Sequence, residues 1–542
     1  MKHLLFAISL LALLTAACAA PAPQPSGGTT SDQPVYGGTF SGWITTDPFD
    51  WDLSYIGKSY PNRNGISLAY NSLLGMQAGP EIAYAQRVLR PELAERWEVS
   101  PDARSFTFHL RKGARFADKA PVNGREVNAA DVKWSYEYWS REGQFKDKKL
   151  PTAQYGWMFE GLDKIETLDA STVKVTFKEP FAPFLSYSAS EFIPVAAHEI
   201  YDRDGNLKDQ ILGTGAYQLE TAQKGSKFSF KKNPTYWNSG RPYIDQIDML
   251  VLPEVATAYA AFQARKLDYL GGGGENVTTE GAKLLAGGAP NAVMYEYANP
   301  QQEELWISVR KPPLDDVRIR KALTLAVDRD ELIKVFTDGK GTWALSGAFP
   351  DTFTQEEIKK MVRYDPAEAK RLVAEAGYAN GLDIEFSYPG KAYGDEYITR
   401  MELMQQQFKK AGINLVFKNM DKETHSSNRK AGDYYLNITG VPLEGDIDSN
   451  LFQWFHSSSK GNYSGMKDPK LNTLIEAQRK EADPGKRNEI VREAVRYINT
   501  EVYDNVALYY PVEGHAWQPW LKNYGPNWGY IGWPLEQAWL DK

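Results

Sequence analysis

From Val35 onward the chain mixes short alternating segments with helices that carry strong start signals, and this mixture restricts the folds open to it. The segment Ser105–Leu110 alternates, which places its three apolar side chains on one face, as in a half-buried strand. Asp365-Pro366-Ala367-Glu368 supplies an N-cap, a proline at the first helical position and an acid at the third, and Gly377 supplies a stop. Similar start signals occur at three other positions: Asn128, Asp468 and Asp483. Because no repeat of solenoid period is present, the sequence predicts an α/β fold with several sheets.

Length and charge indicate a protein of more than one domain that does not bind nucleic acid. The chain has 542 residues, of which 42% are hydrophobic and 24% are charged, close to globular averages. Single hydrophobic cores stop growing at about 250–300 residues, so a chain of this length divides into domains. Lys and Arg number 62 against 69 Asp and Glu, a formal net charge of −7 with mixed signs along the chain. Nucleic-acid binding needs a basic stripe, which this pattern does not provide.

The N-terminal segment predicts secretion and a lipid anchor. Lys2 and His3 precede a largely apolar run, residues 4–14, and small residues then lead to Cys18, the only cysteine of the chain. This is the pattern of a secretory signal. A cysteine directly after small residues resembles the lipobox of bacterial lipoproteins, where that cysteine is acylated and becomes the first residue. Thr15 departs from the leucine usual at its position, and plain secretion is the alternative.

This pattern divides the N-terminal region into a signal peptide and a tether. Residues 1–17 are predicted to be a lipoprotein signal peptide. Residues 18–34 are predicted to be a lipidated, disordered tether, because they contain no large apolar residue and are rich in Pro, Ser, Gly and Thr. No later stretch approaches 18 apolar residues, so we expect a mature protein that does not span the membrane and is held at its extracytoplasmic face by lipid.

The sequence contains fragments of catalytic and metal-binding motifs, but each fragment lacks residues that the motif requires. The glycine run at 271–274 lacks the following Lys-Ser or Lys-Thr of a phosphate-binding loop. His198-Glu199 lacks the second histidine of a zinc-protease motif, and the six histidines are scattered. The acid pair Asp315-Asp316 precedes an amphipathic helix, where a cap explains it. The chain is therefore expected to bind without catalysing a reaction and to need neither cofactor nor metal.

Four segments, in order along the chain, resemble blocks of family 5 of the bacterial extracellular solute-binding proteins. The first opens with Pro91-Glu92-Leu93-Ala94-Glu95-Arg96-Trp97 and continues through an aromatic strand into Leu110-Arg111-Lys112-Gly113. The others are found at residues 213–237, 311–329 and 364–378. This family contains the oligopeptide-, dipeptide- and nickel-binding components of ABC importers. The resemblance implies a monomeric receptor that delivers its solute to a separate ABC permease and ATPase.

The resemblance also implies an architecture: two α/β lobes around a ligand cleft, in the larger periplasmic-binding-protein-like fold (type II, cluster C). Clefts between lobes bind small ligands, and hinge closure buries them. Two chain crossings, near Asn299-Pro300 and near residues 509–511, would form the hinge. The implied parts are lobe I at 35–80, 205–300 and 508–542, an inserted subdomain of lobe I at 81–204, and lobe II at 301–507.

The resemblance also implies that a turn of lobe II contacts the ligand. In peptide-binding relatives an acid of this turn pairs with the α-amino group of the ligand. Gly440, Asn450 and Phe452 match the turn, and Glu444 falls at the position of the acid, whereas Val441 replaces a tryptophan. A glutamate still pairs with an ammonium group, so the resemblance implies a peptide-like ligand. The residues expected to contact it are Glu444, Asp446, Asp448, Asn450 and Trp454.

Three alternatives remain open at this point. The chain contains fifteen tryptophans, several of them crowded into the last ninety residues, and indole rings stack well on sugar faces, so an oligosaccharide receptor of the same family is the first. Aromatic residues also fill large cores, which explains most of these tryptophans without a ligand. A secreted glycosidase is the second alternative, and a structural or chaperone-like surface lipoprotein is the third.

Overall fold

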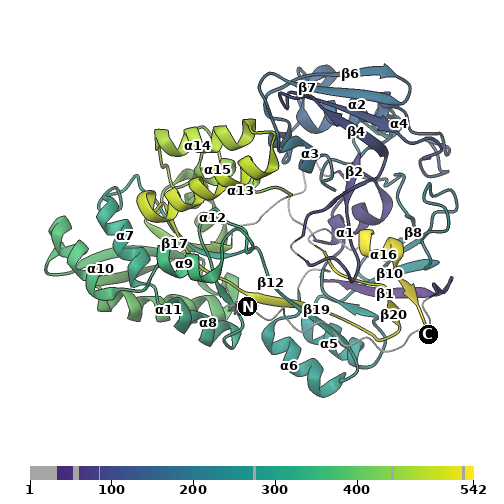
Figure 1. The fold of residues 1–542 in the computed structure, drawn as a ribbon. Helices are drawn as coiled ribbons and strands as arrows, with labels where there is room; N and C mark the ends of the chain where they lie inside the picture. The colour runs from purple at the N-terminus through teal and green to yellow at the C-terminus, as the bar shows by residue number, and fades with distance from the viewer. Residues whose placement is uncertain (1–32, 53–59, 85, 273–275, 441–444, 528–531) are drawn as a thin grey trace, which may run out of the picture. The chain divides into compact units, whose positions relative to one another are not determined.

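Six β-sheets carry the fold in the computed structural model, which describes residues 33–52, 60–84, 86–272, 276–440, 445–527 and 532–542 (Figure 1). Residues Val35–Lys542 form one unit and Met1–Pro34 another. The predicted signal peptide, Cys18 and most of the predicted tether lie outside the described residues, and so does Glu444. Within the described ranges no helix is both long and apolar enough to cross a bilayer.

The first group of sheets brings together segments from both ends of the chain. Strand β1 pairs in parallel with β10, about two hundred residues later, and β10, β9 and β8 continue the sheet with antiparallel pairs. Helices α1 (Tyr60–Ala69) and α16 (Gly532–Gln537) contact each other beside it. The strands are β1 (Thr39–Ile44), β8 (Tyr217–Gln223), β9 (Lys227–Lys232), β10 (Gln246–Val251), and two small pairs, β2 (Leu74–Met76) with β3 (Leu89–Pro91) and β20 (Leu521–Lys522) with β21 (Trp539–Leu540).

A second sheet, of order β4-β5-β7-β6, belongs to the same hydrophobic cluster. Strand β5 (Ser105–Leu110) confirms the predicted alternation, because Phe106, Phe108 and Leu110 are buried while the residues between them are half-buried. The other elements here are β4 (Ala94–Val99), β6 (Leu162–Asp169), β7 (Thr172–Phe177), α2 (Ala129–Ser140), α3 (Phe184–Tyr187), α4 (His198–Asp204) and the 3-10 helices η1 (Gly143–Phe145) and η2 (Gly156–Phe159).

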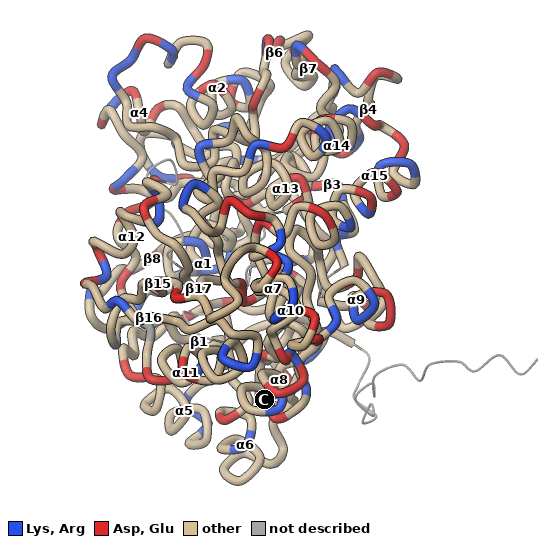
Figure 2. The backbone as a smooth tube through the Cα atoms, turned by 90° about the vertical axis from the view of Figure 1, so that its left-hand side faces the viewer, with Lys and Arg blue, Asp and Glu red and all other residues tan. Residues whose placement is uncertain are grey.

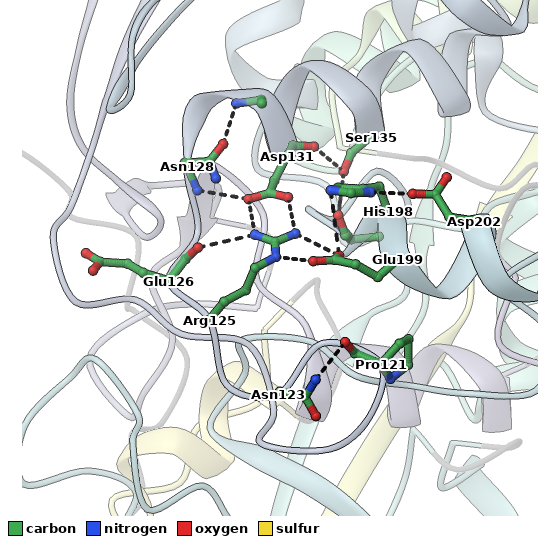
Figure 3. Close-up of polar contacts among 12 residues, drawn as sticks. Pro121, Asn123, Arg125, Glu126, Asn128, Asp131, Ser135, His198, Glu199 and Asp202 are labelled. Carbon is green, nitrogen blue, oxygen red and sulfur yellow. Dashed lines mark hydrogen bonds and ion pairs between the residues drawn. The ribbon is translucent and has the colours of Figure 1, made fainter.

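The start of α2 confirms the cap predicted at Asn128. The Asn128 side chain accepts from the Ala130 amide at 2.8 Å, and Asp131 accepts from the Asn128 amide at 2.9 Å, which together form a capping box (Figure 3). Arg125 then bridges two helices, because its guanidinium bonds Asp131 at the start of α2 and Glu199 on α4, each with one bond of 2.8 Å. Both members of the His198-Glu199 pair thus have structural partners, since His198 bonds Asp202 at 2.7 Å.

The third large sheet, of order β14-β18-β13-β17-β15-β16, has its own hydrophobic cluster, which runs from Leu305 to Tyr509. Its parallel pairs are β15 with β16 and with β17. The strands are β13 (Glu303–Ile307), β14 (Thr342–Trp343), β15 (Leu382–Tyr388), β16 (Ile413–Asn419), β17 (Leu436–Gly440) and β18 (Asn505–Tyr510). The helices are α7 (Val317–Ala326), α8 (Arg329–Thr337), α9 (Gln355–Met361), α10 (Pro366–Val373), α11 (Gly394–Lys410), α12 (Lys422–Ala431), α13 (Asp448–Phe455), α14 (Pro469–Lys480), α15 (Pro484–Tyr497), the 3-10 helix η4 (Gly390–Tyr393) and the π-helical turns η3 (Ala374–Tyr378) and η5 (Ile498–Val502).

The predicted helix starts of this part are confirmed by their hydrogen bonds. Asp365, Asp468 and Asp483 each accept from the backbone amide three residues later, and each is followed by proline in the first turn. Asp316 caps α7 by accepting from the Arg318 amide, two residues later, which confirms the cap interpretation of that acid pair. The predicted stop after α10 takes the form of a π-helical turn in which Gly377 has a φ of 100°, a conformation that favours glycine.

A small sheet links the two groups. Strands β11 (Tyr269–Leu270) and β12 (Val293–Ala298) both pair with β19 (Val512–Trp517), and α5 (Val255–Gln263) and α6 (Thr279–Gly288) pack beside them. The chain passes from β12 into β13 and returns from β18 into β19, and Figure 1 shows β12 and β19 side by side at this link. The Asn299 amide donates to the Pro511 carbonyl at 2.8 Å, so the two crossings are hydrogen-bonded to each other where the sequence predicts the hinge.

Charged residues of both signs are interspersed over the helices. Figure 2 shows basic and acidic positions side by side along α9, α10 and α15. This mixture agrees with the near balance of charge in the sequence. Any strong local potential must therefore come from the arrangement of particular side chains within a cavity.

Candidate ligand-binding cleft

A cavity of about 430 Å³ lies between the segment that leads into η2 and the helices of the third sheet. This volume falls in the range of small-molecule sites. On one side it is lined by residues of the predicted inserted subdomain, and on the other by residues of β13, α12, β17, α13 and the loop after α13. The described lining residues are Gln154, Tyr155, Trp157, Trp306, Ser426, Arg429, Lys430, Thr439, Gly440, Ser449, Gln453, Trp454 and Tyr463.

Aromatic rings form much of the cavity wall. Trp306 on β13 is 3% exposed and packs edge-on against Trp454 of α13, with ring centroids 5.3 Å apart. Tyr463 contacts both indoles at 5.9 Å. From the opposite side, Trp157 packs against Tyr187, which is itself buried, at 5.2 Å. Rigid rings of this kind can cover an apolar or planar ligand group at low entropic cost, and Trp454, predicted from the sequence, is one of them.

The charge on the described cavity wall is positive. Arg429 and Lys430, in the last turn of α12, line the cavity, and the described lining contains neither Asp nor Glu. Arg429 Nη1 donates to Thr439 Oγ1 at 2.7 Å, and its guanidinium carbon lies 5.8 Å from the Trp306 ring. Hydroxyl and amide groups of Ser426, Ser449 and Gln453 supply further polar atoms. The wall can therefore hold an apolar group and an acceptor-rich group at the same time.

Asp446, the first of the two predicted acids beyond Glu444, is paired with an arginine. It is buried and accepts from Arg487 Nη1 at 3.0 Å. Burial raises the pKa of the Asp446 carboxyl, but the Arg487 ion pair and hydrogen bonds outweigh that effect and hold the pKa below its usual value. It is not among the described residues that line the cavity.

Asp448 lies at the start of α13 and is fully buried. It accepts from the Tyr187 hydroxyl at 3.0 Å and lies 3.2 Å from Arg479 Nε, while burial raises the pKa of its carboxyl. Asn450, two residues on, is also fully buried, and neither of its side-chain polar atoms has a partner among the described residues. Neither side chain is part of the described lining, so Trp454 is the described member of the predicted set that reaches the cavity.

Several contacts join the predicted inserted subdomain, residues 81–204, to the part that carries the third sheet. The Arg479 side chain on α14 donates from Nη1 to Glu160 at 2.9 Å, and its guanidinium carbon lies 4.7 Å from the centroid of the Phe181 ring. The backbone carbonyl of Arg479 accepts a hydrogen bond of 2.8 Å from the Ala182 amide. The Tyr187–Asp448 hydrogen bond makes the same connection. At another place, the Arg87 guanidinium lies 3.6 Å from the ring centroid of Phe349. These contacts join the two parts of the chain beside the cavity.

Most residues that line the cavity and join its two sides could not be predicted from the sequence. Tyr155, Trp157, Trp306 and Arg429 stand in segments without a motif, and Arg479 is one of many basic residues on helical faces. The one available signal was proximity to a resemblance block, since Trp306 stands five residues before the segment 311–329. Which aromatic and basic residues meet is decided by strand order, which no local pattern records.

Comparison with known proteins identifies the family. The family model of the bacterial extracellular solute-binding proteins, family 5 (middle region), matches residues 88–463. The chain belongs to this family. It is 29% identical over 423 residues to the dipeptide-binding protein of Escherichia coli K12, covering 74% of this chain and 78% of that protein. It is 28% identical over 396 residues to heme-binding protein A of Haemophilus influenzae, covering 69% and 70%.

Solved structures of family 5 and related binding proteins share the fold. An ABC transporter-associated periplasmic binding protein from Helicobacter pylori, in complex with the peptide STSA, superposes with a TM-score of 0.77 at 23% identity, covering 94% of this chain and 99% of that one. The oligopeptide-binding protein AppA of Bacillus subtilis, in complex with a nonapeptide, gives 0.73 at 19% identity, covering 94% and 100%. The predicted fold class, an α/β periplasmic-binding-protein-like fold of two lobes, is thereby confirmed.

Proposed function

We propose that this family 5 solute-binding protein is the extracytoplasmic receptor of an ABC importer and captures a peptide-like solute in the cavity beside α12 and α13. The observation that carries the proposal is that cavity, which lies between two separately packed parts of a chain of this family and combines aromatic walls with charged and polar groups. Relatives named for dipeptide and di/tripeptide binding support a peptide over a sugar as the ligand.

The cavity and the contacts beside it support a mechanism of lobe closure. We assign lobe I to 35–80, 205–300 and 508–542, its inserted subdomain to 81–204 and lobe II to 301–507, with the hinge at the hydrogen-bonded crossings near Asn299 and Pro511. A ligand that touches both walls binds the closed arrangement more tightly than the open one and shifts the equilibrium by that difference. The closed, monomeric receptor then docks on a permease, whose ATPase subunit is a separate chain, and the protein itself catalyses no reaction.

Glu444 remains the proposed anchor for the α-amino group of the peptide, although it lies outside the described residues. The Glu444→Gln variant keeps the size of the side chain but loses its charge, so affinity for a free-amine peptide should fall about 10- to 100-fold. Affinity for the N-acetylated form of the same peptide should stay nearly unchanged, because that peptide presents no cation. Titration calorimetry with the matched pair measures both.

The same titrations test the proposed function as a whole. A wild-type protein that binds a neutral oligosaccharide and no peptide would replace the peptide assignment by the sugar receptor. Turnover of a sugar substrate would replace it by the glycosidase. Equal losses for the free-amine and acetylated peptides in Glu444→Gln would instead mean that Glu444 supports its loop. If neither affinity changes, the anchor lies elsewhere.

We further propose that Cys18 carries the lipid that holds the receptor at the extracytoplasmic face of the membrane. The Cys18→Ser variant lacks the thiol to which the lipid would be attached, so the protein should move from the membrane pellet to the soluble fraction after cell fractionation. Its far-ultraviolet spectrum and melting temperature should match those of the wild type, because residue 18 precedes the unit Val35–Lys542. A serine variant that still sediments with membranes would exclude lipid anchoring at this residue.

A further inference from the structure

We infer that the cavity binds a carboxylate of its ligand at Arg429, beside an aromatic pocket made by Trp306, Trp454 and Tyr463. This inference rests on the proposed function and deepens it, because it states which chemical group of a peptide-like solute the second lobe recognises. The carboxylate can be the C-terminus of the peptide or an acidic side chain. The supporting observation is that buried N–H donors of Arg429 and Trp454 line this cavity and have no hydrogen-bond acceptor among the described residues.

The first observation is that Arg429 has no carboxylate partner among the described residues. Its Nη1 donates to Thr439, and its Nε is buried with no hydrogen-bond partner. The two arginines beside the predicted acids differ in this respect, since Arg479 is paired with Asp448 and Arg487 with Asp446. A guanidinium group offers five donors in a fixed fork that matches a carboxylate. A half-buried guanidinium that keeps donors free on a cavity wall is therefore suited to an incoming anion.

A second donor without an acceptor lines the same cavity. The Trp454 Nε1 atom is buried and has no partner among the described residues. In folded proteins the great majority of buried polar atoms have a hydrogen-bond partner, so two such donors on one wall call for an acceptor inside the cavity. Lys430 adds positive charge, and the described lining offers no carboxylate to neutralise it. An acceptor-rich anion satisfies both the donors and the charge.

The structure around Arg429 also holds the guanidinium in place before a ligand arrives. Helix α12 is capped at its start by Asp421 and ends at Gly432 in the left-handed conformation, so the last turn has a defined position. Thr439 of β17 accepts from the guanidinium, and the Trp306 ring of β13 lies beside it. A positioned side chain loses little freedom on binding, which favours affinity.

The nearest titratable group on α12 does not compete for this role. His425, one turn before Arg429, is buried, and burial together with the Arg429 charge lowers its pKa. The imidazole is therefore neutral at pH 7 and leaves Arg429 and Lys430 as the cations of the described wall.

The test compares acids with their amides in wild type and in Arg429→Gln. Trialanine and trialanine amide differ only at the C-terminus, whereas Ala-Glu-Ala amide and Ala-Gln-Ala amide differ only in the side chain. We expect calorimetry on the wild type to give about 10- to 100-fold tighter binding of the acid in one of the two pairs, and that pair identifies the source of the carboxylate. Arg429→Gln should abolish the preference, and Arg429→Lys should retain part of it.

Lys422→Gln is the matched control, because Lys422 is an exposed residue at the start of the same helix and does not line the cavity. It should leave the preference of the wild type intact. The inference is overturned if Arg429→Gln weakens acid and amide equally, or if the wild type shows no preference in either pair while binding all four peptides. If the wild type binds none of them, the proposed function fails and this inference fails with it. Melting curves of each variant show that it is folded.

Discussion

At pH 8 the Asp504→Asn variant is expected to resist unfolding more strongly than the wild type, by up to about 4 kcal/mol. Asp504 is fully buried directly before β18, and burial raises the pKa of its carboxyl from the ordinary 3.8 to about 7, with Ser464 and Arg320 opposing only part of that effect. The folded protein therefore holds a proton on Asp504 that the unfolded chain has already lost above pH 4. The stabilisation that this proton provides is complete below about pH 4 and is lost as the pH rises through 7.

Urea denaturation between pH 4 and pH 8 measures this difference. Asparagine is close to a protonated aspartate in size and hydrogen bonding, so the gap between variant and wild type should open with rising pH and vanish near pH 4. Asp433→Asn is the control, because Lys311 lies 2.6 Å from that exposed carboxylate and lowers its pKa, which gives a small effect of opposite sign. An Asp504→Asn variant that is less stable than wild type at every pH would mean that its carboxylate is ionised in the fold.

Glu304 should add to the same pH dependence of the wild type. It is 1% exposed on β13, and burial raises the pKa of its carboxyl to about 7, opposed in part by hydrogen bonds to Gln302 and Ser346. The sign is the same as for Asp504, so both carboxyls lower the stability of the protein as the pH rises through 7. This behaviour could not be expected from the sequence, in which both residues are ordinary acids next to strands.

Local structure was predictable here because its causes are local. The caps at Asn128, Asp365, Asp468 and Asp483 depend on residues within one turn, and each was found where its side chain stands in the sequence. The two-lobed architecture was predictable because four segments of the sequence resemble blocks of the family. The pairing of β1 with β10 could not be derived in the same way, because its partners are separated by about two hundred residues and neither strand carries a mark of the other.

The candidate site was predicted only where a block of resemblance reached it. Trp454 was predicted, but Arg429 stands on a helix that carries two other cationic side chains, Lys422 and Lys430. Charge alone could therefore not single it out, because other helices such as α15 also carry several basic residues. Asp446 and Asp448 were predicted as ligand contacts because they stand in the turn after Gly440. Their partners Arg487 and Arg479 stand thirty to forty residues later, and only the packing of α13, α14 and α15 brings these charges together.

Arg479→Met is expected to weaken ligand binding at least about 100-fold if the lobes close as proposed, because Arg479 joins the two sides beside the cavity. Its side chain is 12% exposed and lies between Asp448 of the proposed lobe II and Glu160 of the proposed inserted subdomain. In the closed form, its removal leaves the buried Asp448 carboxylate without its cation, and breaking a buried ion pair in this way costs about 3–5 kcal/mol. In an open form, water reaches Asp448 and that cost is largely avoided, so the substitution penalises closure more than folding.

Scattering and calorimetry on three variants separate this role from a general loss of stability. With a bound peptide, the radius of gyration of the wild type should fall, whereas Arg479→Met should stay near its ligand-free value at the same peptide concentration. Lys480→Met removes a neighbouring exposed cation of α14 and should behave as wild type. Adding Asp448→Asn to Arg479→Met removes the uncompensated charge of the buried carboxylate. The double variant should therefore recover a measurable part of the affinity, although it lacks an acid that the sequence predicts to contact the ligand. A double variant that binds more weakly than Arg479→Met would mean that Asp448 contacts the ligand directly, as the sequence first suggested, and that its pairing with Arg479 only positions it.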